Sequence, residues 1–392
     1  MPEITNIEDL RVLAERRVPR MFYDYCDSGS WTESTYRANT DDFAKIGIRQ
    51  KVARNMEGRS TQTTMIGETL KMPVVLAPVG STGMQHADGE ILACRAAHKF
   101  GTQFTLSTMS VCSVEDVAEN VDKPFWFQLY VMRDREFTGK LIDRAKAAGC
   151  SALVLTLDLQ ILGQRHKDIK NGLSVPPKPT LPVILDLATK WRWGLGMLKT
   201  QRRTFRNIVG HVEGVKDTRD LAMWAANMFD PKLSWDDIAW IKDRWGGKVI
   251  LKGILDPEDA LEATKYGCDA LVVSNHGGRQ LDGALSSIEA LPGIAEAVGD
   301  KIELHIDSGI RSGQDVLKSM ALGAKGTYIG RAFNYGLGAM GEEGVTKALE
   351  IIHKELDLSM AFSGETNLSD VGQHTIILPR ERAQMALGDA PN

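Results

Sequence analysis

The strongest constraint on the fold is a series of eight short apolar runs, each rich in β-branched or aromatic residues. They occupy residues 73–78, 103–107, 126–130, 152–158, 248–253, 270–275, 302–307 and 326–330. Amphipathic segments with helical spacing, such as FTGKLIDRAKAAG and GQDVLKSMALGA, lie between most of them. Apolar strands that alternate with helices are typical of a parallel sheet covered on both faces. Eight such units predict a closed (β/α)8 barrel of the TIM type.

An open, doubly wound sheet is the alternative architecture. It would place a G-x-G-x-x-G fingerprint after the first strand, but that strand ends here in APVGSTGMQ. We therefore expect a single α/β domain over residues 1–392, with an N-terminal helical segment and a barrel over about 70–360. A long insertion over about 172–232 separates the fourth and fifth strands.

Composition excludes several classes of protein. A net charge of −4 gives no reason to expect a nucleic-acid partner. The five cysteines are scattered without a C-x-x-C pair, which favours reduced thiols in the cytoplasm and argues against a metal site. The N-terminus lacks the apolar core of a signal peptide, and no apolar run is long enough to cross a bilayer. We expect a protein that is soluble or lies on a membrane surface.

Small or hydrogen-bonding residues stand at the end of every predicted strand. In chain order they are Pro78, Val79 and Gly80, Ser107, Gln128 with Tyr130, Thr156 with Asp158, Lys252, Ser274 with His276, Asp307, and Gly330 with Arg331. The carboxyl ends of barrel strands meet on one rim, where enzymes of this fold keep their chemistry. The sequence therefore predicts an active site built from these residues.

The last two units carry the signature of a phosphate site. They read DSGIRSG (307–313) and IGRAF (329–333), which supply Gly309 and Gly330 with Arg311 and Arg331. Glycine-rich turns let backbone N–H groups close on a phosphate, and a helix that begins near Ser312 would point its positive end at the anion. Two ordinary strand-to-helix turns are the alternative.

The remaining rim residues suit a flat heterocycle. Ser107, Gln128 and Thr156 offer both donors and acceptors, and Lys252 would place a positive charge where a reduced flavin becomes anionic. Lys252 could also pair with a barrel carboxylate or form a Schiff base. A sugar-phosphate aldolase or isomerase therefore remains an alternative at this point.

The collinear motifs resemble those of FMN-dependent L-2-hydroxy acid dehydrogenases and oxidases. They are YDYCDSG, LAPVG, TLST, FQLY, LTLD, LKGIL, SNHGGRQLDG, DSGIR and IGRAF, and they cover nearly the whole chain. SNHGGRQLDG is the most specific of them. The resemblance implies FMN, bound by Pro78, Val79, Gly80, Ser107, Gln128, Thr156, Lys252, Ser274, Asp307, Gly309, Arg311, Gly330 and Arg331.

The resemblance also implies catalytic roles. His276 is the base that takes a proton from the substrate, and we expect Asp307 to orient its ring. Arg165 and Arg279 correspond to the residues that bind the substrate carboxylate, a task that suits a bidentate cation. Tyr25 and Tyr130 correspond to the phenols that contact the substrate. Two alternatives concern single residues. Arg165 could instead lie in a solvated loop, and Tyr25 could pack its helix while Tyr23 contacts the substrate.

The expected reaction is oxidation of an L-2-hydroxy acid, foremost L-lactate to pyruvate, with transfer of the electrons to a quinone or cytochrome. The alternatives are (S)-mandelate as substrate or oxygen as acceptor, with hydrogen peroxide as product. Gly80 stands where the oxidases often have alanine, which favours the dehydrogenases. Met109 and Leu162 are expected to border the substrate side chain, and relatives are commonly homotetramers.

The insertion contains a basic and aromatic segment, residues 180–210. Six cations occur there without an intervening acid, interleaved with tryptophan, leucine, methionine and phenylalanine. This composition is typical of a segment that lies in a lipid interface. We expect a cytoplasmic protein that contacts the inner face of the cell membrane through this segment. A lid over the barrel rim, or contact with a neighbouring subunit, is the alternative.

Overall fold

The computed structural model describes residues 3–173, 180–212, 215, 224 and 228–386. Eight parallel strands form one sheet in the order β4-β11-β10-β9-β8-β7-β6-β5. Their bounds are β4 Val74–Leu76, β5 Thr105–Ser107, β6 Trp126–Tyr130, β7 Ala152–Thr156, β8 Lys248–Ile254, β9 Ala270–Val273, β10 Glu303–Ile306 and β11 Gly326–Ile329. A parallel bridge between Leu76 and Phe104 joins the two end strands, so the sheet closes. The predicted barrel is confirmed, and every strand begins and ends within two residues of the bounds of its predicted run.

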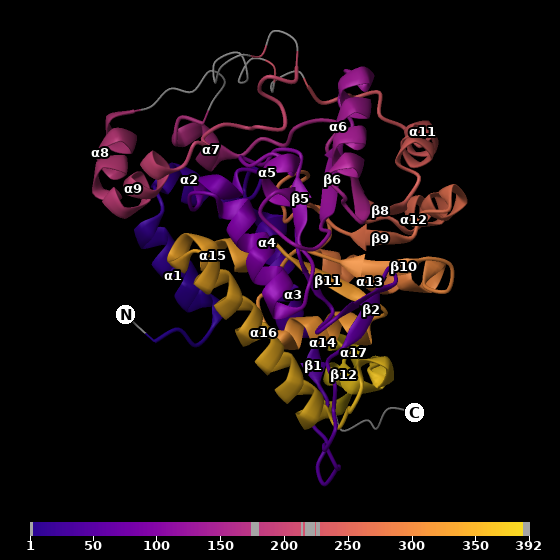
Figure 1. Cartoon of the computed structure of the whole chain (residues 1–392). Helices are drawn as coiled ribbons and strands as arrows, with labels where there is room; N and C mark the ends of the chain where they lie inside the picture. Colours follow the sequence, from indigo (N-terminus) through magenta and orange to yellow (C-terminus); the bar gives the residue numbers. More distant parts are fainter. Residues whose placement is uncertain (1–2, 174–179, 213–214, 216–223, 225–227, 387–392) are drawn as a thin grey trace.

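Helices surround the barrel, and three more precede it (Figure 1). The N-terminal helices are α1 Ile7–Arg17, α2 Arg20–Cys26 and α3 Ser34–Lys45. The helices that follow strands are α4 Gly89–Phe100, α5 Val114–Ala118, α6 Arg135–Ala147, α11 Asp236–Trp245, α12 Pro257–Ala263, α13 Ser287–Val298, α14 Gly313–Ala321, α15 Arg331–Met340 and α16 Glu342–Ser363. The C-terminal α17 spans Pro379–Ala386, and short strands β1 Gly47–Ile48 and β12 Ile376–Ile377 pair antiparallel.

The N-terminal helices are fastened to the carboxyl rim of the barrel. Both carboxylate oxygens of Asp282, in the motif SNHGGRQLDG, accept hydrogen bonds from the start of α3. The donors are the backbone N–H groups of Thr32 and Thr35 and the hydroxyls of Thr32 and Ser34. A carboxylate that satisfies the free N–H groups of a helix start stabilises that helix. The motif therefore holds α2 and α3 over the mouth of the barrel.

A two-stranded hairpin closes the opposite end of the barrel. Strands β2 (Thr63–Met65) and β3 (Glu68–Leu70) place Met65, Ile66 and Leu70 against the inward-facing side chains of the barrel. Met65 is fully buried, and burial of one such side chain contributes about 1.5–3 kcal/mol. Glu68 on the same hairpin accepts a hydrogen bond from Trp126 Nε1 at 3.2 Å. The interior is thus packed below the rim.

The insertion between β7 and β8 contains α7 His166–Lys170, α8 Leu181–Thr189 and α9 Trp191–Lys199. Residues 174–179, 213–214, 216–223 and 225–227 of the predicted insertion lie outside the described part of the chain. The segment 180–210 divides into two parts. Helix α8 has no buried residue, whereas Asn207 is fully buried and accepts a hydrogen bond from the backbone N–H of Val114.

Candidate active site

The turn after β9 presents His276 to the rim in an unusual backbone conformation. His276 has φ +58°, and the two glycines that follow it have φ +71° each. A Cβ atom on Gly278 would lie 2.5 Å from the backbone nitrogen of Tyr36 on α3. Only glycine permits that approach, so the turn and α3 pack backbone against backbone. A non-glycine residue at positive φ is uncommon and is concentrated at functional sites.

The His276 ring lies between a carboxylate and a phenol. Its Nδ1 is 2.9 Å from Oδ1 of Asp158, and its Nε2 is 3.5 Å from Oη of Tyr130. Burial raises the pKa of Asp158, but His276 outweighs burial and holds that pKa below its usual value. Asp158 is therefore a carboxylate that accepts the Nδ1 hydrogen. Nε2 is left as the nitrogen that faces Tyr130, and both residues line the cavity described below.

The expectation that Asp307 orients the His276 ring is wrong. Oδ2 of Asp307 lies 2.9 Å from Nζ of Lys252, and its Oδ1 accepts a hydrogen bond from the Ser308 hydroxyl at 2.7 Å. Both aspartates follow barrel strands, but only Asp158 is on the side of the ring where Nδ1 points. A Cβ atom on Gly253 would lie 2.6 Å from Cγ of Asp158, so this glycine leaves the space that the carboxylate occupies.

Lys252 is a buried ammonium group on the floor of the site. It is 4% exposed, and Nζ donates to Ser274 Oγ at 2.9 Å as well as pairing with Asp307. Burial lowers the pKa of Lys252, but Asp307 and, to a lesser degree, Asp158 raise it above its usual value. The group therefore stays charged, as electrostatic stabilisation requires and as a Schiff-base lysine would not.

Two arginines meet beside Tyr25. The guanidinium carbons of Arg165 and Arg279 lie 5.7 Å and 4.9 Å from the centre of the Tyr25 ring. Arg165 Nε donates to Asp168 at 2.6 Å, whereas Arg279 donates to the Tyr25 carbonyl oxygen at 2.6 Å and has no carboxylate partner among the described residues. Burial and the neighbouring Arg165 lower the pKa of Arg279. The pair therefore has an unbalanced positive charge that suits an anionic substrate.

Ser107, Gln128 and Thr156 form a row across three neighbouring strands. Gln128 Oε1 accepts from Ser107 Oγ at 3.1 Å, and Gln128 Nε2 donates to Thr156 Oγ1 at 3.0 Å. All three are buried, and neither they nor Ser274 are among the residues that line the cavity described next. Their role in cofactor binding stays a prediction.

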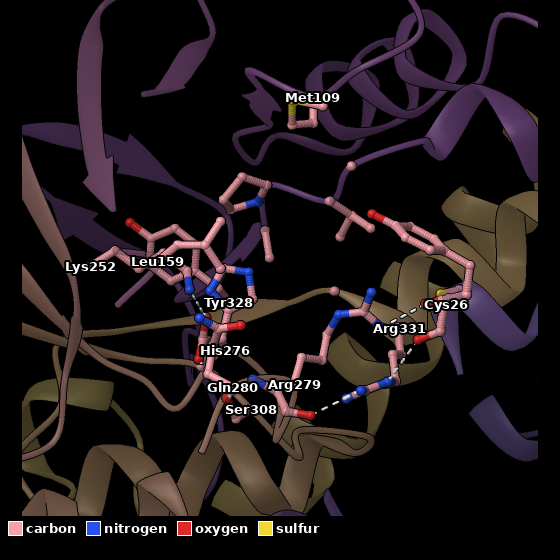
Figure 2. A pocket seen from close by; sticks show the side chains of 18 of the residues that line it. Cys26, Met109, Leu159, Lys252, His276, Arg279, Gln280, Ser308, Tyr328 and Arg331 are labelled. Carbon is pink, nitrogen blue, oxygen red and sulfur yellow. Dashed lines mark hydrogen bonds and ion pairs between the residues drawn. The ribbon is translucent and has the colours of Figure 1, made fainter. Parts of the chain in front are cut away.

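The carboxyl rim encloses a cavity of about 260 Å³ (Figure 2). The predicted residues that line it are Tyr25, Pro78, Val79, Gly80, Tyr130, Arg165, Lys252, His276, Arg279, Asp307, Gly309, Arg311, Gly330 and Arg331. Met109 and Leu162 line it too. The structure adds lining residues that the sequence analysis did not assign to the site, among them Leu159, Phe205, Met228, Phe229, Gln280 and Tyr328. Phe205, Met228 and Phe229 come from the insertion, where periodicity gave no signal.

Gln280 ties the loop after β7 to the histidine turn. Its Nε2 donates to the carbonyl oxygens of Asp158 at 2.7 Å and Ile161 at 3.0 Å, and its Oε1 accepts from the Gly163 N–H at 3.1 Å. These bonds fix the loop that carries Asp158 at one end and Arg165 at the other. The glutamine of SNHGGRQLDG therefore positions both Asp158, the partner of His276, and Arg165.

The end of the cavity near β10 and β11 has the features of an anion site. Gly309, Arg311, Gly330 and Arg331 line it, and neither arginine forms an ion pair with a carboxylate among the described residues. At the start of α14, Asp315 accepts a hydrogen bond from the Ser312 N–H and Glu355 accepts one from the Gly313 N–H. The expectation that this helix turns its positive end toward a phosphate stays a prediction. Helix α15 also begins here, and the absence of an acidic residue from its first turn makes its start a suitable place for an anion.

Arg331 also joins separate segments of the chain. Its guanidinium donates to the carbonyl oxygens of Cys26 at 3.1 Å, Ser28 at 2.8 Å and Gly277 at 2.9 Å. It lies 4.5 Å from the centre of the Tyr36 ring. The same residue therefore lines the anion site and holds the end of α2 against the histidine turn.

Comparisons with known proteins agree with this geometry. Residues 14–378 match the FMN-dependent dehydrogenase family. An L-lactate dehydrogenase from Pectobacterium atrosepticum is 45% identical over 380 residues, which covers 97% of this chain and 98% of that protein. The crystal structure of the monotopic membrane protein (S)-mandelate dehydrogenase has a TM-score of 0.91 at 34% identity and covers 95% of this chain and 99% of that one.

A structure of mandelate oxidase with (S)-2-phenylpropionate has a TM-score of 0.79 at 30% identity and covers 95% of this chain and 98% of that one. All of these similarities extend from the N-terminal helices through the last barrel strand. The chain belongs to the FMN-dependent dehydrogenase family.

Proposed function

We propose that this FMN-dependent dehydrogenase oxidises an L-2-hydroxy acid, with L-lactate as the first candidate, to the corresponding 2-keto acid. The observation that carries the proposal is the His276–Asp158 pair, which lies in one cavity with two arginines and a buried lysine. Oxidation of a hydroxy acid requires a base, a site that binds the substrate carboxylate, and a positive charge that stabilises the reduced flavin. The 45% identity to an L-lactate dehydrogenase supports lactate.

The residues of the cavity fit FMN. Arg311 and Arg331 supply positive charge without a carboxylate partner in the described chain, and the start of α15 adds N–H groups for the phosphate. Lys252 stays charged beneath the rim. When bound, FMN supplies the two-electron acceptor for the substrate.

The protein residues then divide the remaining tasks. Arg165 and Arg279 bind the substrate carboxylate, and Tyr25 lies against both guanidinium groups. Tyr130 and Nε2 of His276 face the same point of the cavity, where the hydroxyl of the substrate would lie. Nε2 takes one of the two protons that the substrate loses. Asp158 stabilises the resulting imidazolium, since a negative charge 2.9 Å away favours the charged ring.

A second substrate, (S)-mandelate, is favoured by the apolar wall of the cavity. Met109, Leu159, Leu162, Phe205 and Phe229 line it, and Phe229 packs edge to face on Tyr130 with ring centres 5.6 Å apart. Such a wall can receive a phenyl ring. The (S)-mandelate dehydrogenase structure, with its TM-score of 0.91, supports the same candidate.

The proposal is tested by anaerobic bleaching of the flavin with a panel of 2-hydroxy acids that includes L-lactate, D-lactate, glycolate and (S)-mandelate. We expect L-lactate to bleach it fastest and D-lactate to fail. His276→Gln should still bind FMN but turn over at least about 10²–10⁴-fold more slowly, because loss of a general base commonly has that effect. Absence of bleaching by every acid, or near-normal turnover of His276→Gln, would refute the proposal.

We also propose that α8 and α9 contact a lipid surface and that the electrons pass to a membrane quinone. Six apolar side chains on these helices are at least half exposed: Leu181, Ile184, Leu185, Trp191, Leu195 and Leu198. Arg192 lies over the Trp191 ring at 5.1 Å. Exposed leucines and a tryptophan beside cations are typical of an interfacial helix. No helix in the described residues is long and apolar enough to span a bilayer.

Helix α2 and the segment that follows β4 hold these two helices. Trp193 stacks on Phe22 of α2 with ring centres 5.4 Å apart, and its Nε1 donates to the Met84 carbonyl oxygen at 2.8 Å. The backbone N–H of Arg20 donates to Asp186 at 2.6 Å. Figure 1 shows α8 and α9 at one side of the molecule, next to α2. We place this side on the inner face of the cell membrane, in a cytoplasmic homotetramer.

Vesicle binding tests the lipid contact. The triple variant Leu185→Ser, Trp191→Ser, Leu198→Ser should lose most of its partitioning onto anionic lipid vesicles while it keeps FMN. A matched control replaces three exposed apolar residues elsewhere with serine: Val52, Leu358 and Phe362. Equal partitioning of both variants would refute the contact. A separate measurement tests the proposed acceptor. If the electrons pass to a quinone, a quinone analogue should reoxidise the reduced enzyme much faster than oxygen does.

A further inference from the structure

The motif YDYCDSG contains a buried carboxylate, Asp27, that the proposed mechanism does not use. Asp27 is 7% exposed, and three phenol hydroxyls donate to its two oxygens. Oδ1 accepts from Tyr36 at 2.7 Å and from Tyr335 at 2.6 Å, and Oδ2 accepts from Tyr23 at 2.8 Å. A buried charge is costly unless hydrogen bonds surround it, so this cluster is a built feature.

Asp27 is ionised in this cluster. Burial raises its pKa, but hydrogen bonds from the three tyrosines, foremost Tyr335, and the charge of Arg331 outweigh burial and hold the pKa below its usual value. A carboxylate can only accept, so all three phenols donate to it. The two bonds to Oδ1 have the length of charge-assisted O–H···O⁻ bonds, which are about twice as strong as neutral ones. The carboxylate therefore fixes where each phenol ring lies.

The three phenols come from helices that are distant in the sequence. Tyr23 is on α2, Tyr36 is on α3 and Tyr335 is on α15. Helix α15 begins with Arg331, which lines the anion site. Tyr23 also accepts a hydrogen bond from Arg11 of α1 at 2.9 Å. One carboxylate thus joins the N-terminal helices to the helix that follows β11.

Two of the phenol rings face the arginines of the anion site. The guanidinium carbon of Arg331 lies 4.5 Å from the centre of the Tyr36 ring. That of Arg311 lies 5.8 Å from the centre of the Tyr335 ring. A cation within about 6 Å of a ring centre is attracted to the face of the ring. The position of each ring therefore helps to set the position of one arginine.

The cluster also keeps the arginine N–H groups available. Among the described residues Asp27 forms one ion pair, with Arg11 at 3.9 Å, and it pairs with neither Arg311 nor Arg331. Arg331 instead donates to the carbonyl oxygen of Cys26, the residue before Asp27 (Figure 2). A direct ion pair would use the N–H groups that a phosphate needs. The phenols transmit the position of the carboxylate without using those groups.

We propose that Asp27 is a positioning residue for the FMN phosphate, because it fixes the two phenol rings that hold Arg311 and Arg331. The inference rests on the proposed binding of FMN with its phosphate at this end of the cavity, and it is independent of which hydroxy acid is oxidised. A negative charge repels a nearby anion, so loss of the charge of Asp27 alone would strengthen FMN binding. Loss of positioning would weaken it, which gives the two effects opposite signs.

The test is the preference of the holoenzyme for FMN over riboflavin, which lacks the phosphate. Purified holoenzyme is incubated with increasing riboflavin, and the flavins that stay bound after ultrafiltration are quantified by chromatography. Asp27→Asn keeps the shape of the side chain, but its amide has one acceptor oxygen for three phenol donors. We expect the preference for FMN to fall at least about tenfold, which is the effect of losing one hydrogen bond to a charged group.

Matched variants separate positioning from general loosening of the fold, which would weaken the binding of both flavins alike. Tyr335→Phe and Tyr36→Phe keep the rings but remove the donors, and each should lower the preference for FMN by a smaller factor. Tyr23→Phe removes the third donor to the same carboxylate, but within the described chain neither Arg311 nor Arg331 lies over its ring. This control should lower the melting temperature and keep the wild-type preference.

An unchanged or increased preference for FMN in Asp27→Asn would overturn the proposal. An equal loss of preference in Tyr23→Phe and Tyr335→Phe would do the same. If Asp27→Asn does not fold, Tyr335→Phe decides the question by the same measurement.

Arg311→Gln separates this outcome from the proposed function. If Arg311→Gln lowers the preference for FMN but Asp27→Asn does not, the phosphate site stands and this inference fails. If Arg311→Gln leaves the preference unchanged, the phosphate binds elsewhere and the inference fails with its premise. Failure of all hydroxy acids to bleach the flavin would reject the substrate assignment and leave this measurement intact.

Discussion

Replacing Asp158 with asparagine tests the assignment of the histidine partner. The variant keeps the shape of the side chain and an oxygen for the Nδ1 hydrogen, but it removes the negative charge 2.9 Å from the ring. The side chains of His276 and Asp158 are 20% and 14% exposed, so solvent screens the pair only weakly. The hydrogen bond should therefore have the strength of a charged one.

The expected magnitude follows from that bond. A hydrogen bond to a charged group contributes about 1.5–3 kcal/mol, and each 1.36 kcal/mol changes a rate about tenfold. If the charge acts mainly on the protonated ring, Asp158→Asn should lower the rate of flavin reduction by about 10- to 150-fold. Stopped-flow mixing with substrate under anaerobic conditions measures this step without contribution from reoxidation.

Asp307→Asn is the matched control. Asp307 pairs with Lys252, so its replacement should change the reduction potential of FMN more than Asp158→Asn does. A reduction rate of Asp158→Asn within threefold of the wild type would refute the reasoning. So would a potential that responds to Asp158→Asn but not to Asp307→Asn.

Three other predictions concern the turn and the rim. Gly278→Ala should lower the melting temperature and FMN content, because its Cβ would meet the backbone of α3 at 2.5 Å. Gly283→Ala has a similar positive φ but open space around it, so a strain of about 1–2 kcal/mol and intact activity are expected. Asp282→Asn should destabilise the fold near neutrality. Hydrogen bonds outweigh burial and lower the pKa of Asp282. In urea titrations, the free energy of unfolding of the variant should therefore be lower than that of the wild type by its full amount above about pH 4, and this loss should become smaller as the pH falls further. In Gly80→Ala the new Cβ atom would lie 3.2 Å from Oη of Tyr25 and crowd it. We expect this variant to produce hydrogen peroxide in a larger share of its turnovers.

The sequence predicted the barrel and most of the cavity because both depend on local patterns. Apolar runs mark strands, and the residue after each run must stand on the rim wherever the barrel closes. His276, Lys252 and Arg331 were therefore predicted from position alone, whereas Arg279 was predicted from the family resemblance. The structure brings all four to one cavity.

The partner of His276 could not be read in the same way. Asp158 and Asp307 both follow strands, and the choice between them depends on the direction in which φ +58° turns the histidine. The capping of α14 by Glu355 depends on a residue 42 positions away in the sequence. Phe205, Met228 and Phe229 reach the cavity from an insertion without a repeating pattern. Tertiary contacts decided each of these cases.

The placement of Arg331 has a consequence for protein production. This side chain joins the carbonyl oxygens of Cys26, Ser28 and Gly277 and faces the anion site at the same time. Without a bound phosphate, three guanidinium groups, those of Arg279, Arg311 and Arg331, gather here, and Asp27 is the carboxylate that Arg331 stabilises. Cells that overexpress the chain faster than riboflavin is supplied should therefore accumulate apoprotein whose N-terminal helices are held less firmly and are cut more readily by proteases.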